Sequence, residues 1–334
     1  MNTKSIIIAS KAMLSILGIA IYASLVLTAC SDDNEPSQLL RNDCLKRTLG
    51  PNVVGNEIYF VYAMAQPNGS GHIVNANVEA SIAGAEGTTL ENSSYHTNDA
   101  GTDIPVVVGN PCVNNGNNTS VTFTVDTCAA ALRYHYIIPE EARGKEVSFT
   151  FTAKNNLGET VEYQMGPYAI SKCEIKRNIE LKKSRCYISI ADMEAYTLDE
   201  IQDMSKIDLV YLWRNKSDEG VEFGHVFAAP SADREWLDDT AIPEGMNNNI
   251  LLRREYGIID AHLTDEPNYG TYIDDIDFET IELEGMPNYC VNMKTEAGMW
   301  VETQDGKYRA YIYINSLKKT SGGTISIKRY KMHD

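Results

Sequence analysis

The chain has 334 residues, of which 43% are hydrophobic, and it carries a formal net charge of −17. A chain of this length and composition can form two domains, each with its own core. Such an acidic surface repels nucleic acid and anionic lipid headgroups, so we expect no nucleic-acid partner and no charge-driven attachment to a membrane.

The first predicted element is a leader peptide. Two basic residues, Lys4 and Lys11, precede an apolar stretch that runs to residue 29, and Cys30 follows this stretch. A basic start, an apolar middle and small residues before a cleavage site are typical of a secretory signal. The sequence Leu-Thr-Ala before Cys30 predicts a lipoprotein signal, in which residues 1–29 are removed and the Cys30 thiol is acylated. An uncleaved transmembrane anchor is the alternative, because the apolar stretch is about long enough to span a bilayer.

Cleavage would leave 305 residues with a charge of −19, because the leader carries two lysines and no acidic residue. We expect residues 30–43 to comprise the acylated Cys30 and a flexible tether. The sequence Ser-Asp-Asp-Asn-Glu after Cys30 resembles the acidic export signal of Bacteroidetes lipoproteins. This resemblance implies a lipid-anchored protein of the outer membrane that faces the cell exterior and touches the membrane through its lipid alone.

Residues 44–170 are predicted to form an immunoglobulin-like β-sandwich. Apolar Ala76, Val78 and Ala80 alternate with polar Asn75 and Asn77, which is the period of a half-buried strand. Short strands separated by Gly, Asn and Pro turns are typical of such sandwiches. The predicted strands are 57–63, 74–82, 105–108, 120–125, 131–137, 145–153 and 159–166.

Residues 171–334 are predicted to form a second, β-rich domain with one or two short helices, which would bind the ligand. Thr197 and Glu200 have the spacing of a helix start, and 231–237 suggests a second short helix. Residues 251–259 stay ambiguous between helix and strand. The predicted strands are 177–181, 185–190, 207–213, 223–228, 272–278, 280–283, 299–303, 308–314 and 323–330.

Six cysteines follow Cys30, and an even number in an exported chain permits disulfides. Cys112 and Cys128 flank an Asn-rich turn, and Cys173 and Cys186 bracket a predicted hairpin, so these two pairings are candidates. The alternative is that they are free and buried, since Cys also behaves as a small apolar residue.

The sequence has no recognisable catalytic motif and no Cys/His cluster with zinc spacing. We therefore expect no enzyme and no cofactor. The densest acidic cluster contains Asp275, Asp277 and Glu279, which would share one face of a strand. A solvated strand face is the simplest interpretation, and calcium binding or catalysis by paired carboxylates are the alternatives.

Aromatic residues offer the better candidate for a binding site, because Tyr occurs 19 times and Phe only seven. Tyr and Trp present a flat apolar face with a polar group, which suits the C–H faces of sugar rings. On the strand 308–314 and its continuation, one face would carry Arg309, Tyr311, Tyr313 and Asn315 as a ligand platform. The alternative is that a helix or the other domain covers this face.

Trp213 and Trp236 are further candidates for ligand contact. Trp213 lies at the end of a predicted strand, and Trp236 lies in a predicted surface turn, where we expect the greater exposure. Trp300 lies within a strand, where a core position is more common.

Four stretches resemble a family of two-domain Bacteroidales surface lipoproteins of uncharacterised function. They are residues 145–176, which include Lys-Glu-Val-Ser-Phe-Thr-Phe-Thr-Ala, and residues 207–212, 272–278 and 308–314. The resemblance covers most of the mature chain and implies glycan binding, by analogy with other outer-surface lipoproteins of these bacteria. No site motif of the family transfers to individual residues.

The sequence therefore predicts a non-catalytic surface lipoprotein that binds carbohydrate through aromatic side chains of its second domain. An adhesin-like or fimbria-like subunit, which binds a surface protein or its own copies, is the first alternative. A glycoside hydrolase with unrecognised carboxylates is the second.

Overall fold

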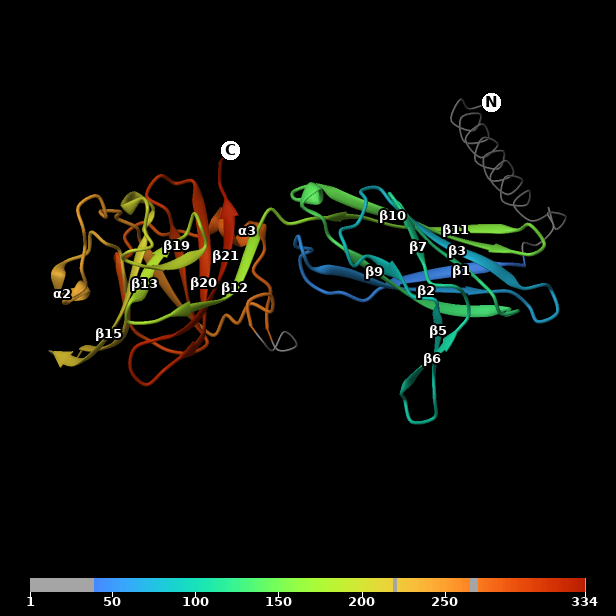
Figure 1. The fold of residues 1–334 in the computed structure, drawn as a ribbon, viewed down its shortest axis with the longest axis horizontal. Coiled ribbons are helices and arrows are strands. Elements are labelled where there is room, and N and C mark those ends of the chain that lie inside the picture. Colours follow the sequence, from blue (N-terminus) through green and yellow to red (C-terminus); the bar gives the residue numbers. More distant parts are fainter. Residues whose placement is uncertain (1–38, 219–220, 265–269, 334) are drawn as a thin grey trace, which may run out of the picture.

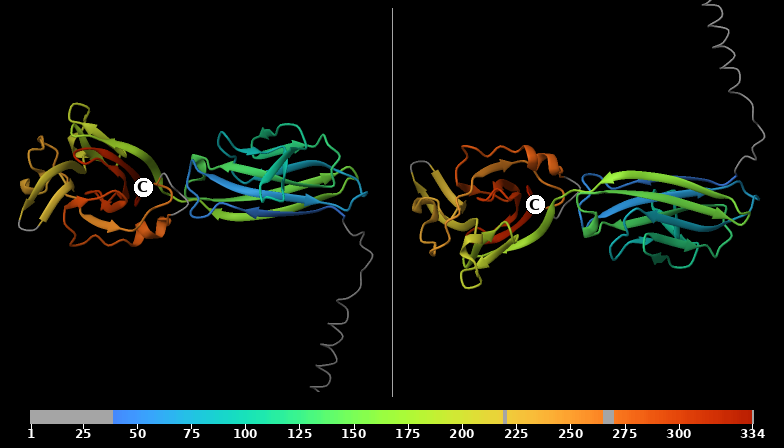
Figure 2. Two further views of the ribbon diagram at one scale, coloured as in Figure 1. Left: turned by 90° about the horizontal axis from the view of Figure 1, so that it is seen from below. Right: turned by 90° about the horizontal axis from the view of Figure 1, so that it is seen from above.

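The computed structural model describes residues 39–218, 221–264 and 270–333 and consists mainly of β-strands in two domains (Figure 1). Figure 2 shows from two other sides that the domains lie end to end. The predicted fold class, mainly β with one or two short helices in the second domain, is confirmed. Within the described ranges, no helix has the length and apolar character needed to cross a membrane.

The first domain is a sandwich of two antiparallel sheets. The four-stranded sheet has the order β1 (Arg41–Lys46), β2 (Glu57–Ala65), β9 (Ala129–Ile137) and β4 (Thr89–Leu90). The five-stranded sheet has the order β11 (Thr160–Ala169), β10 (Glu146–Asn155), β3 (Ile73–Ala80), β8 (Asn118–Thr122) and β7 (Val113–Asn115). A 3-10 turn, η1 (Glu140–Ala142), precedes β10.

Aromatic rings from both sheets fill the space between them. The Phe60 ring lies with its centroid 4.9 Å from that of Phe149 and 5.3 Å from that of Phe151, both edge to face. Tyr134 and Tyr136 pack against the same two phenylalanines. Edge-to-face pairs add about 0.5–1.5 kcal/mol each to the stabilisation from burial alone, so these rings hold the two sheets together.

A hairpin of β5 (Ser93–Thr97) and β6 (Asp103–Val107) projects from the first domain (Figure 1). Its second strand leaves Val106 and Val107 48% and 62% exposed. Arg133 lies over the Tyr95 ring in the middle of the hairpin, and its guanidinium pairs with Asp103 near the turn. These contacts attach the hairpin to β9 of the sandwich.

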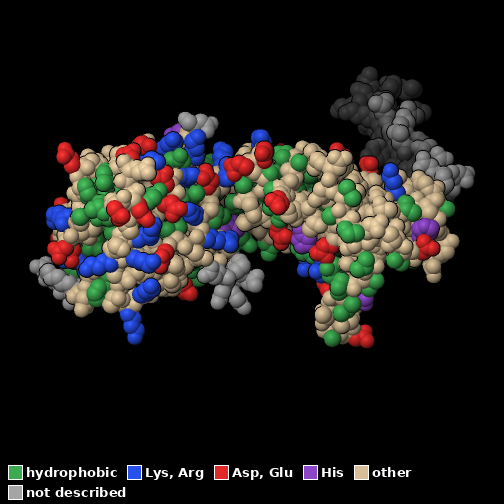
Figure 3. All heavy atoms as spheres, viewed as in Figure 1, with side chains coloured by type: hydrophobic (Ala, Val, Ile, Leu, Met, Phe, Trp, Pro, Cys, Tyr) green, Lys and Arg blue, Asp and Glu red, His purple; other side chains and the backbone are tan. Residues whose placement is uncertain are grey.

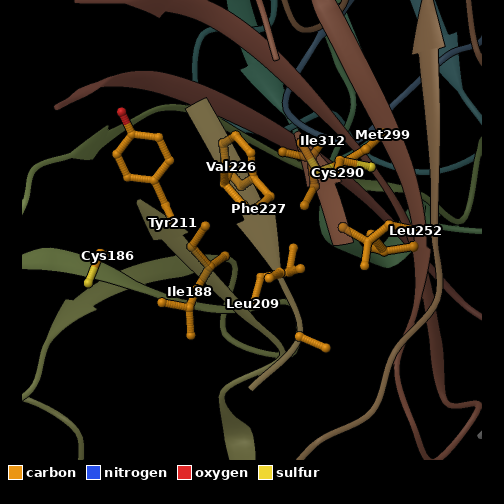
Figure 4. Close-up of a cluster of buried hydrophobic side chains, with 14 of the residues drawn as sticks. Cys186, Ile188, Leu209, Tyr211, Val226, Phe227, Leu252, Cys290, Met299 and Ile312 are labelled. Atoms are coloured by element: carbon orange, nitrogen blue, oxygen red, sulfur yellow. The ribbon is translucent and has the colours of Figure 1, made fainter. Parts of the chain in front are cut away.

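Two five-stranded sheets form the second domain. The first has the order β12 (Glu174–Leu181), β21 (Gly323–Lys331), β20 (Tyr308–Leu317), β19 (Ala297–Glu302) and β17 (Leu252–Tyr256). The second has the order β14 (Glu194–Thr197), β13 (Arg185–Ser189), β15 (Leu209–Asp218), β16 (Val221–Ala228) and β18 (Tyr289–Met293). Figure 4 shows buried side chains of both sheets in one cluster, including Ile188, Phe227, Met299 and Ile312.

The sheet that contains β20 is buried on both faces. Ala310, Ile312 and Ile314 belong to the cluster between the two sheets. Tyr311 and Tyr313 belong to a separate cluster on the opposite face, which the helix α3 (Asp275–Thr280) and neighbouring segments cover. The alternation predicted for β20 is therefore correct, and both of its faces are packed.

The acidic cluster forms this helix, and the strands predicted at 272–278 and 280–283 are wrong. The Asp274 carboxylate accepts from the backbone N–H of Ile276 and Asp277, and the Asp277 carboxylate accepts from the Asp274 N–H. This reciprocal capping starts a helix, and it overrides an apolar alternation that is also compatible with a strand. Ile276 consequently points outward and is 65% exposed, whereas Phe278 is buried.

The other helix predictions have mixed outcomes. The helix α2 (Arg234–Leu237) lies within the predicted 231–237 range, and the ambiguous 251–259 segment contains strand β17. No helix starts at Thr197, which ends β14. Glu200 accepts the Thr197 N–H across a turn, and a 3-10 turn follows later, η2 (Met204–Lys206), capped by Asp203.

The chain joins the first sheet earlier than expected. Strand β1 begins at Arg41 and Leu40 is buried, so the tether predicted to extend to residue 43 ends before these residues. The backbone N–H groups of Leu39 and Leu40 both donate to the Glu159 carboxylate at 3.2 Å. This carboxylate therefore fixes the start of the domain.

The junction between the two domains is fixed by contacts on both sides. Within the second domain, the Asp275 carboxylate accepts from the Ser171 hydroxyl and, at 3.0 Å, from the Lys172 N–H. The Arg143 guanidinium of the first domain donates to the Cys173 carbonyl. Gly50 of the first domain lies so close to the Tyr272 ring of the second that a Cβ atom would sit 2.6 Å from it, so a larger residue at position 50 would have to displace this ring.

Candidate ligand pocket

The tyrosine face of β20 is a core surface and not a ligand platform. Tyr311 and Tyr313 are 0% and 2% exposed, and the Tyr311 hydroxyl donates to the Ile258 carbonyl at 2.8 Å. The Trp300 ring packs against Tyr311 at 4.9 Å and against Phe278 of α3. The ring faces of Tyr311 and Tyr313 thus contact other residues of the domain and are not exposed to a sugar.

Arg309 and Asn315 hold that covering segment in place. Arg309 pairs with the Glu302 carboxylate at 2.6 Å and donates to the Phe278 carbonyl at 2.7 Å. The Asn315 amide donates to the Leu263 carbonyl at 2.7 Å. Both side chains therefore have partners within the domain and stabilise the cover over the tyrosine face.

Trp236 is less accessible than expected. Its ring stacks on Tyr289 with centroids 3.7 Å apart and planes 12° apart, and it lies 5.6 Å from the Phe223 ring. It packs against the outer face of the second sheet, where α2 docks. Its role is to close the core on that side.

Trp213 lies in a pocket of about 1070 Å³ in the second domain. Strands β13 and β15 supply the floor, and four loops supply the walls. The residues that line it are Lys183, Ser184, Cys186, Tyr187, Thr197, Leu198, Asp199, Glu200, Tyr211, Leu212, Trp213, Asp238, Asp239, Thr240, Ala241, Thr320 and Ser321. The pocket therefore combines one indole with hydroxyl and carboxylate groups from distant parts of the chain.

Two tyrosine hydroxyls fix the loops around this pocket. The Tyr187 hydroxyl donates to the Ala241 carbonyl at 2.9 Å, which holds the loop that carries Asp238 and Asp239. The Tyr211 hydroxyl accepts from the Gly322 N–H at 2.8 Å, which holds the loop between β20 and β21. Two of the four loops are thus tied to the floor, which preforms this part of the pocket.

Asp199 and Glu200 give the pocket ionised carboxylates. A hydrogen bond from the Thr197 side chain lowers the pKa of Asp199, and one from the Thr197 backbone N–H lowers the pKa of Glu200. Arg185 also pairs with Glu200. Both groups are therefore hydrogen-bond acceptors at neutral pH.

The weak metal candidates Asp275, Asp277 and Glu279 do not converge. Asp275 binds Ser171 and Lys172, Asp277 caps α3, and Glu279 accepts from the Tyr330 hydroxyl at 2.6 Å. In the part of the chain that the structure describes, no group of three His, Cys, Asp or Glu residues could hold a metal ion.

The candidate disulfides are absent, because the cysteines of the described ranges are free thiols. Val113 pairs with Ser120 across the β7–β8 hairpin. In this register, Cys112 would lie opposite residue 121, which is seven residues before Cys128. Cys173 and Cys186 belong to clusters on opposite faces of a sheet. Burial raises the pKa of Cys173 to about 12 and that of Cys186 to about 11, which keeps both protonated.

A buried ionic network that no sequence pattern indicated lies beneath the cover of the first sheet. The Lys328 ammonium on β21 donates to the Asp260 carboxylate at 2.9 Å, to His262 Nδ1 at 3.0 Å and to the Ile273 carbonyl at 2.5 Å. Lys328 and Asp260 are both 0% exposed. Burial and the Lys328 charge lower the pKa of His262 to about 3, so this imidazole stays neutral.

Asp208 is a second buried carboxyl, located outside the pocket. It accepts from the Ile190 N–H at 2.8 Å and from the Asn248 amide at 3.2 Å, yet burial raises its pKa to about 7. Because the folded protein holds this proton more tightly than the unfolded chain, protonation of Asp208 stabilises the fold. This stabilisation is fully present below the unfolded pKa of about 4 and is lost as the pH rises through 7.

Asp208→Asn should therefore become progressively more stable than the wild type as pH rises from 4 to 8. The rise of the Asp208 pKa to about 7 corresponds to about 4 kcal/mol at most. Urea unfolding at several pH values measures this difference. Parallel stability curves for the two proteins would show that Asp208 does not titrate in this range.

Two family models cover almost the whole described chain. One is a domain of unknown function, DUF4466, which matches residues 37–170, and the other is a domain of unknown function, DUF8576, which matches residues 171–332. No curated protein matches the sequence. The two matched ranges meet where the first sandwich ends and the second domain begins.

One solved structure is similar over its full length. It is the crystal structure of a DUF4466 family protein from Parabacteroides merdae, 47% identical, which covers 89% of this chain and 100% of its own, with a TM-score of 0.82. Parabacteroides belongs to the Bacteroidales, in agreement with the resemblance noted in the sequence.

Two other solved structures give TM-scores too low to carry an argument. The major pilin subunit BcpA of Bacillus cereus is 11% identical, with coverage of 86% of this chain and 66% of its own and a TM-score of 0.28. The Actinomyces fimbrial adhesin FimA is 9% identical, with coverage of 88% and 96% and a TM-score of 0.29. On the strength of the Parabacteroides merdae relative, this chain belongs to the DUF4466 family.

Proposed function

We propose that this chain is a lipid-anchored surface protein that binds neutral glycans, without hydrolysing them, in the pocket beside Trp213. The observation that carries the proposal is the combination of this indole with hydroxyls and ionised carboxylates in one cavity. An indole face stacks on the C–H face of a sugar ring, and carboxylate oxygens accept from its hydroxyls.

The size of the pocket suits an oligosaccharide. Its volume of about 1070 Å³ is at the upper end of the range for small-molecule sites. The indole supplies the apolar contact, while Thr197, Thr240, Thr320 and Ser321 add hydroxyl groups around it. Such a mixture of one apolar face and several polar groups fixes the orientation of a bound ring.

The charge of the pocket selects against acidic sugars. Its lining contains four carboxylates, from Asp199, Glu200, Asp238 and Asp239, and a single lysine, Lys183. A carboxylate or sulfate on the ligand would be repelled there. Neutral hexoses and pentoses are therefore the favoured ligand class.

The same carboxylates argue for binding and against hydrolysis. A glycosidase needs a general acid whose pKa is raised, so that it is protonated at working pH. The pKa values of Asp199 and Glu200 are instead lowered. Asp208, whose pKa is raised, is buried away from the pocket and does not line it.

A glycan array probed with the soluble chain from Ser31 onward tests this proposal. We expect binding to neutral glycans and none to their sialylated or sulfated counterparts. The proposal fails if no neutral glycan binds at millimolar concentration in titration calorimetry, or if a bound glycan is cleaved during prolonged incubation.

The surface location rests on Cys30, which lies outside the described residues. Replacing Cys30 with Ser should abolish incorporation of a palmitate analogue and leave the leader uncleaved, because no thiol remains to be acylated. Metabolic labelling followed by mass determination of the amino terminus measures both effects. Equal labelling of the variant and the wild type would show that this cysteine is not the anchor.

An adhesin-like subunit is the second candidate, and the β5–β6 hairpin supports it. Val106 and Val107 expose apolar surface on a projecting element, and β11 is a ten-residue edge strand, a type of element that can pair with another chain. Light scattering after size exclusion tests self-association. A monomer at high micromolar concentration that Val107→Lys leaves unchanged would remove support for assembly through the hairpin.

A further inference from the structure

We propose that the outer face of the five-stranded sheet in the first domain is a second glycan site, which binds an extended neutral polysaccharide by hydrogen bonds. This inference rests on the proposed glycan-binding function, but it concerns a different domain and a different mode of recognition. The face is here named the polar face, and it consists of the outward side chains of β11, β10, β3, β8 and β7.

Strand register aligns five side chains in a row across the sheet, and four of them are polar. Glu162 on β11 pairs with Thr152 on β10, which pairs with Asn77 on β3. Asn77 in turn pairs with Ser120 on β8, which pairs with Val113 on β7. With strands about 4.8 Å apart, this row is roughly 19 Å long, which is longer than one sugar ring.

A neighbouring row continues the same chemistry and leaves a hollow. Lys154 pairs with Asn75, which pairs with Thr122. The two rows border an open depression of about 600 Å³. The residues that line it are Asn75, Asn77, Val113, Asn115, Asn118, Ser120, Thr152, Lys154, Thr160 and Glu162. The polar face is thus concave and not a flat solvated surface.

The asparagines in the middle of β3 need an explanation, because Asn is depleted in strands. Asn77 donates to the Asn118 side-chain carbonyl at 3.1 Å, and Asn75 donates to the Val121 backbone carbonyl at 3.1 Å. These bonds fix the orientation of the two amides, and in the proposed complex their carbonyl oxygens accept from the ligand. Oriented amides and hydroxyls in rows match the hydroxyls of a polysaccharide, each of which both donates and accepts.

Charge supports a neutral occupant. Residues 39–170 contain 20 charged side chains, whereas residues 171–334 contain 50. Figure 3 shows the same contrast, with mostly uncharged side chains over the first domain and mixed acidic and basic groups over the second. The hollow itself holds one lysine and one glutamate, Lys154 and Glu162. Neither an anionic polymer nor an apolar protein surface is complementary to such a lining.

Affinity electrophoresis of the chain from Ser31 onward tests the polar face with defined polymers. The gels contain dextran, galactomannan or xyloglucan as neutral probes and polygalacturonate as the anionic probe. The test variant combines Asn77→Ala with Thr152→Ala, and the matched control is Asn68→Ala in an exposed turn. Thermal melting of each variant confirms that the first domain is folded.

We expect at least one neutral polymer to retard the wild type and the control equally. The double variant should bind that polymer about 30-fold more weakly, because each of the two lost hydrogen bonds contributes about 1 kcal/mol. Adding Trp213→Ala to the double variant should remove the remaining retardation. Polygalacturonate should retard none of the proteins.

Other outcomes would overturn the inference and separate it from the proposed pocket. If the double variant migrates like the wild type while Trp213→Ala abolishes retardation, the polar face is not a site and the pocket is. If the double variant loses binding and Trp213→Ala does not, the polar face stands and the pocket proposal fails. Retardation of the wild type by polygalacturonate alone, or by no polymer, would overturn the inference.

Discussion

Replacing Lys328 with Met should lower the free energy of unfolding of the second domain by about 3–5 kcal/mol. The Lys328 ammonium is fully buried, and its donors meet Asp260, His262 and the Ile273 carbonyl. Removing the cation leaves the Asp260 carboxylate buried without a counter-charge, which costs far more than the loss of one hydrogen bond. Urea unfolding followed by tryptophan fluorescence measures the loss, since Trp213, Trp236 and Trp300 are all in this domain.

A double variant separates the unpaired charge from a simple packing defect. Lys328→Met combined with Asp260→Asn removes both charges and keeps an acceptor for the His262 N–H, which Asp260 binds at 2.8 Å. We expect it to recover a substantial part of the lost stability. If the double variant is as unstable as the single variant, the loss comes from packing around residue 328 and not from the uncompensated charge.

Replacing Trp213 with Ala should weaken binding of the neutral glycan selected on the array by about 30-fold or more. This loss corresponds to about 2 kcal/mol, which is typical of an aromatic hot spot in a binding site. The expected cause is the loss of the only indole that lines the pocket. Titration calorimetry at a fixed salt concentration measures this change in the dissociation constant.

Two matched variants define what this result means. Trp213→Phe keeps a flat ring and should retain part of the affinity. Trp236→Phe changes an indole that stacks on Tyr289 outside the pocket and should leave the affinity unchanged. Equal affinity of Trp213→Ala and the wild type would show that the glycan binds elsewhere. The polar face of the first domain would then be the remaining candidate.

Much of the strand content could be predicted, because strands with one buried face have a period of two. Residues 57–63, 131–137 and 308–314 were placed on strands that the structure extends by a few residues. The pattern failed at 272–278, where Ile276 and Phe278 also alternate with acidic residues. There, side-chain capping by Asp274 and Asp277 produces a helix, and a period of two within so short a segment cannot separate the two structures.

The candidate site was harder to predict, because exposure depends on what covers each sheet. The face with Tyr311 and Tyr313 has the composition of a ligand platform, but α3 packs against it and the Tyr311 hydroxyl donates to the Ile258 carbonyl. The greater exposure expected for Trp236 than for Trp213 also depended on contacts that the sequence does not reveal. Trp236 stacks on Tyr289, which is distant in sequence, whereas Trp213 is surrounded by loops that converge only in the fold.

By itself, the sequence determined the two-domain, mainly β organisation and the two different faces of β20, because these follow from local alternation of side chains. The tertiary structure alone decided which of those faces is covered, where the Lys328 charge finds its partners, and which loops surround Trp213. The reason is that Lys328 lies 68 positions from Asp260 and 66 from His262, so these side chains come into contact only after distant strands have paired. No local period in a sequence records such a contact.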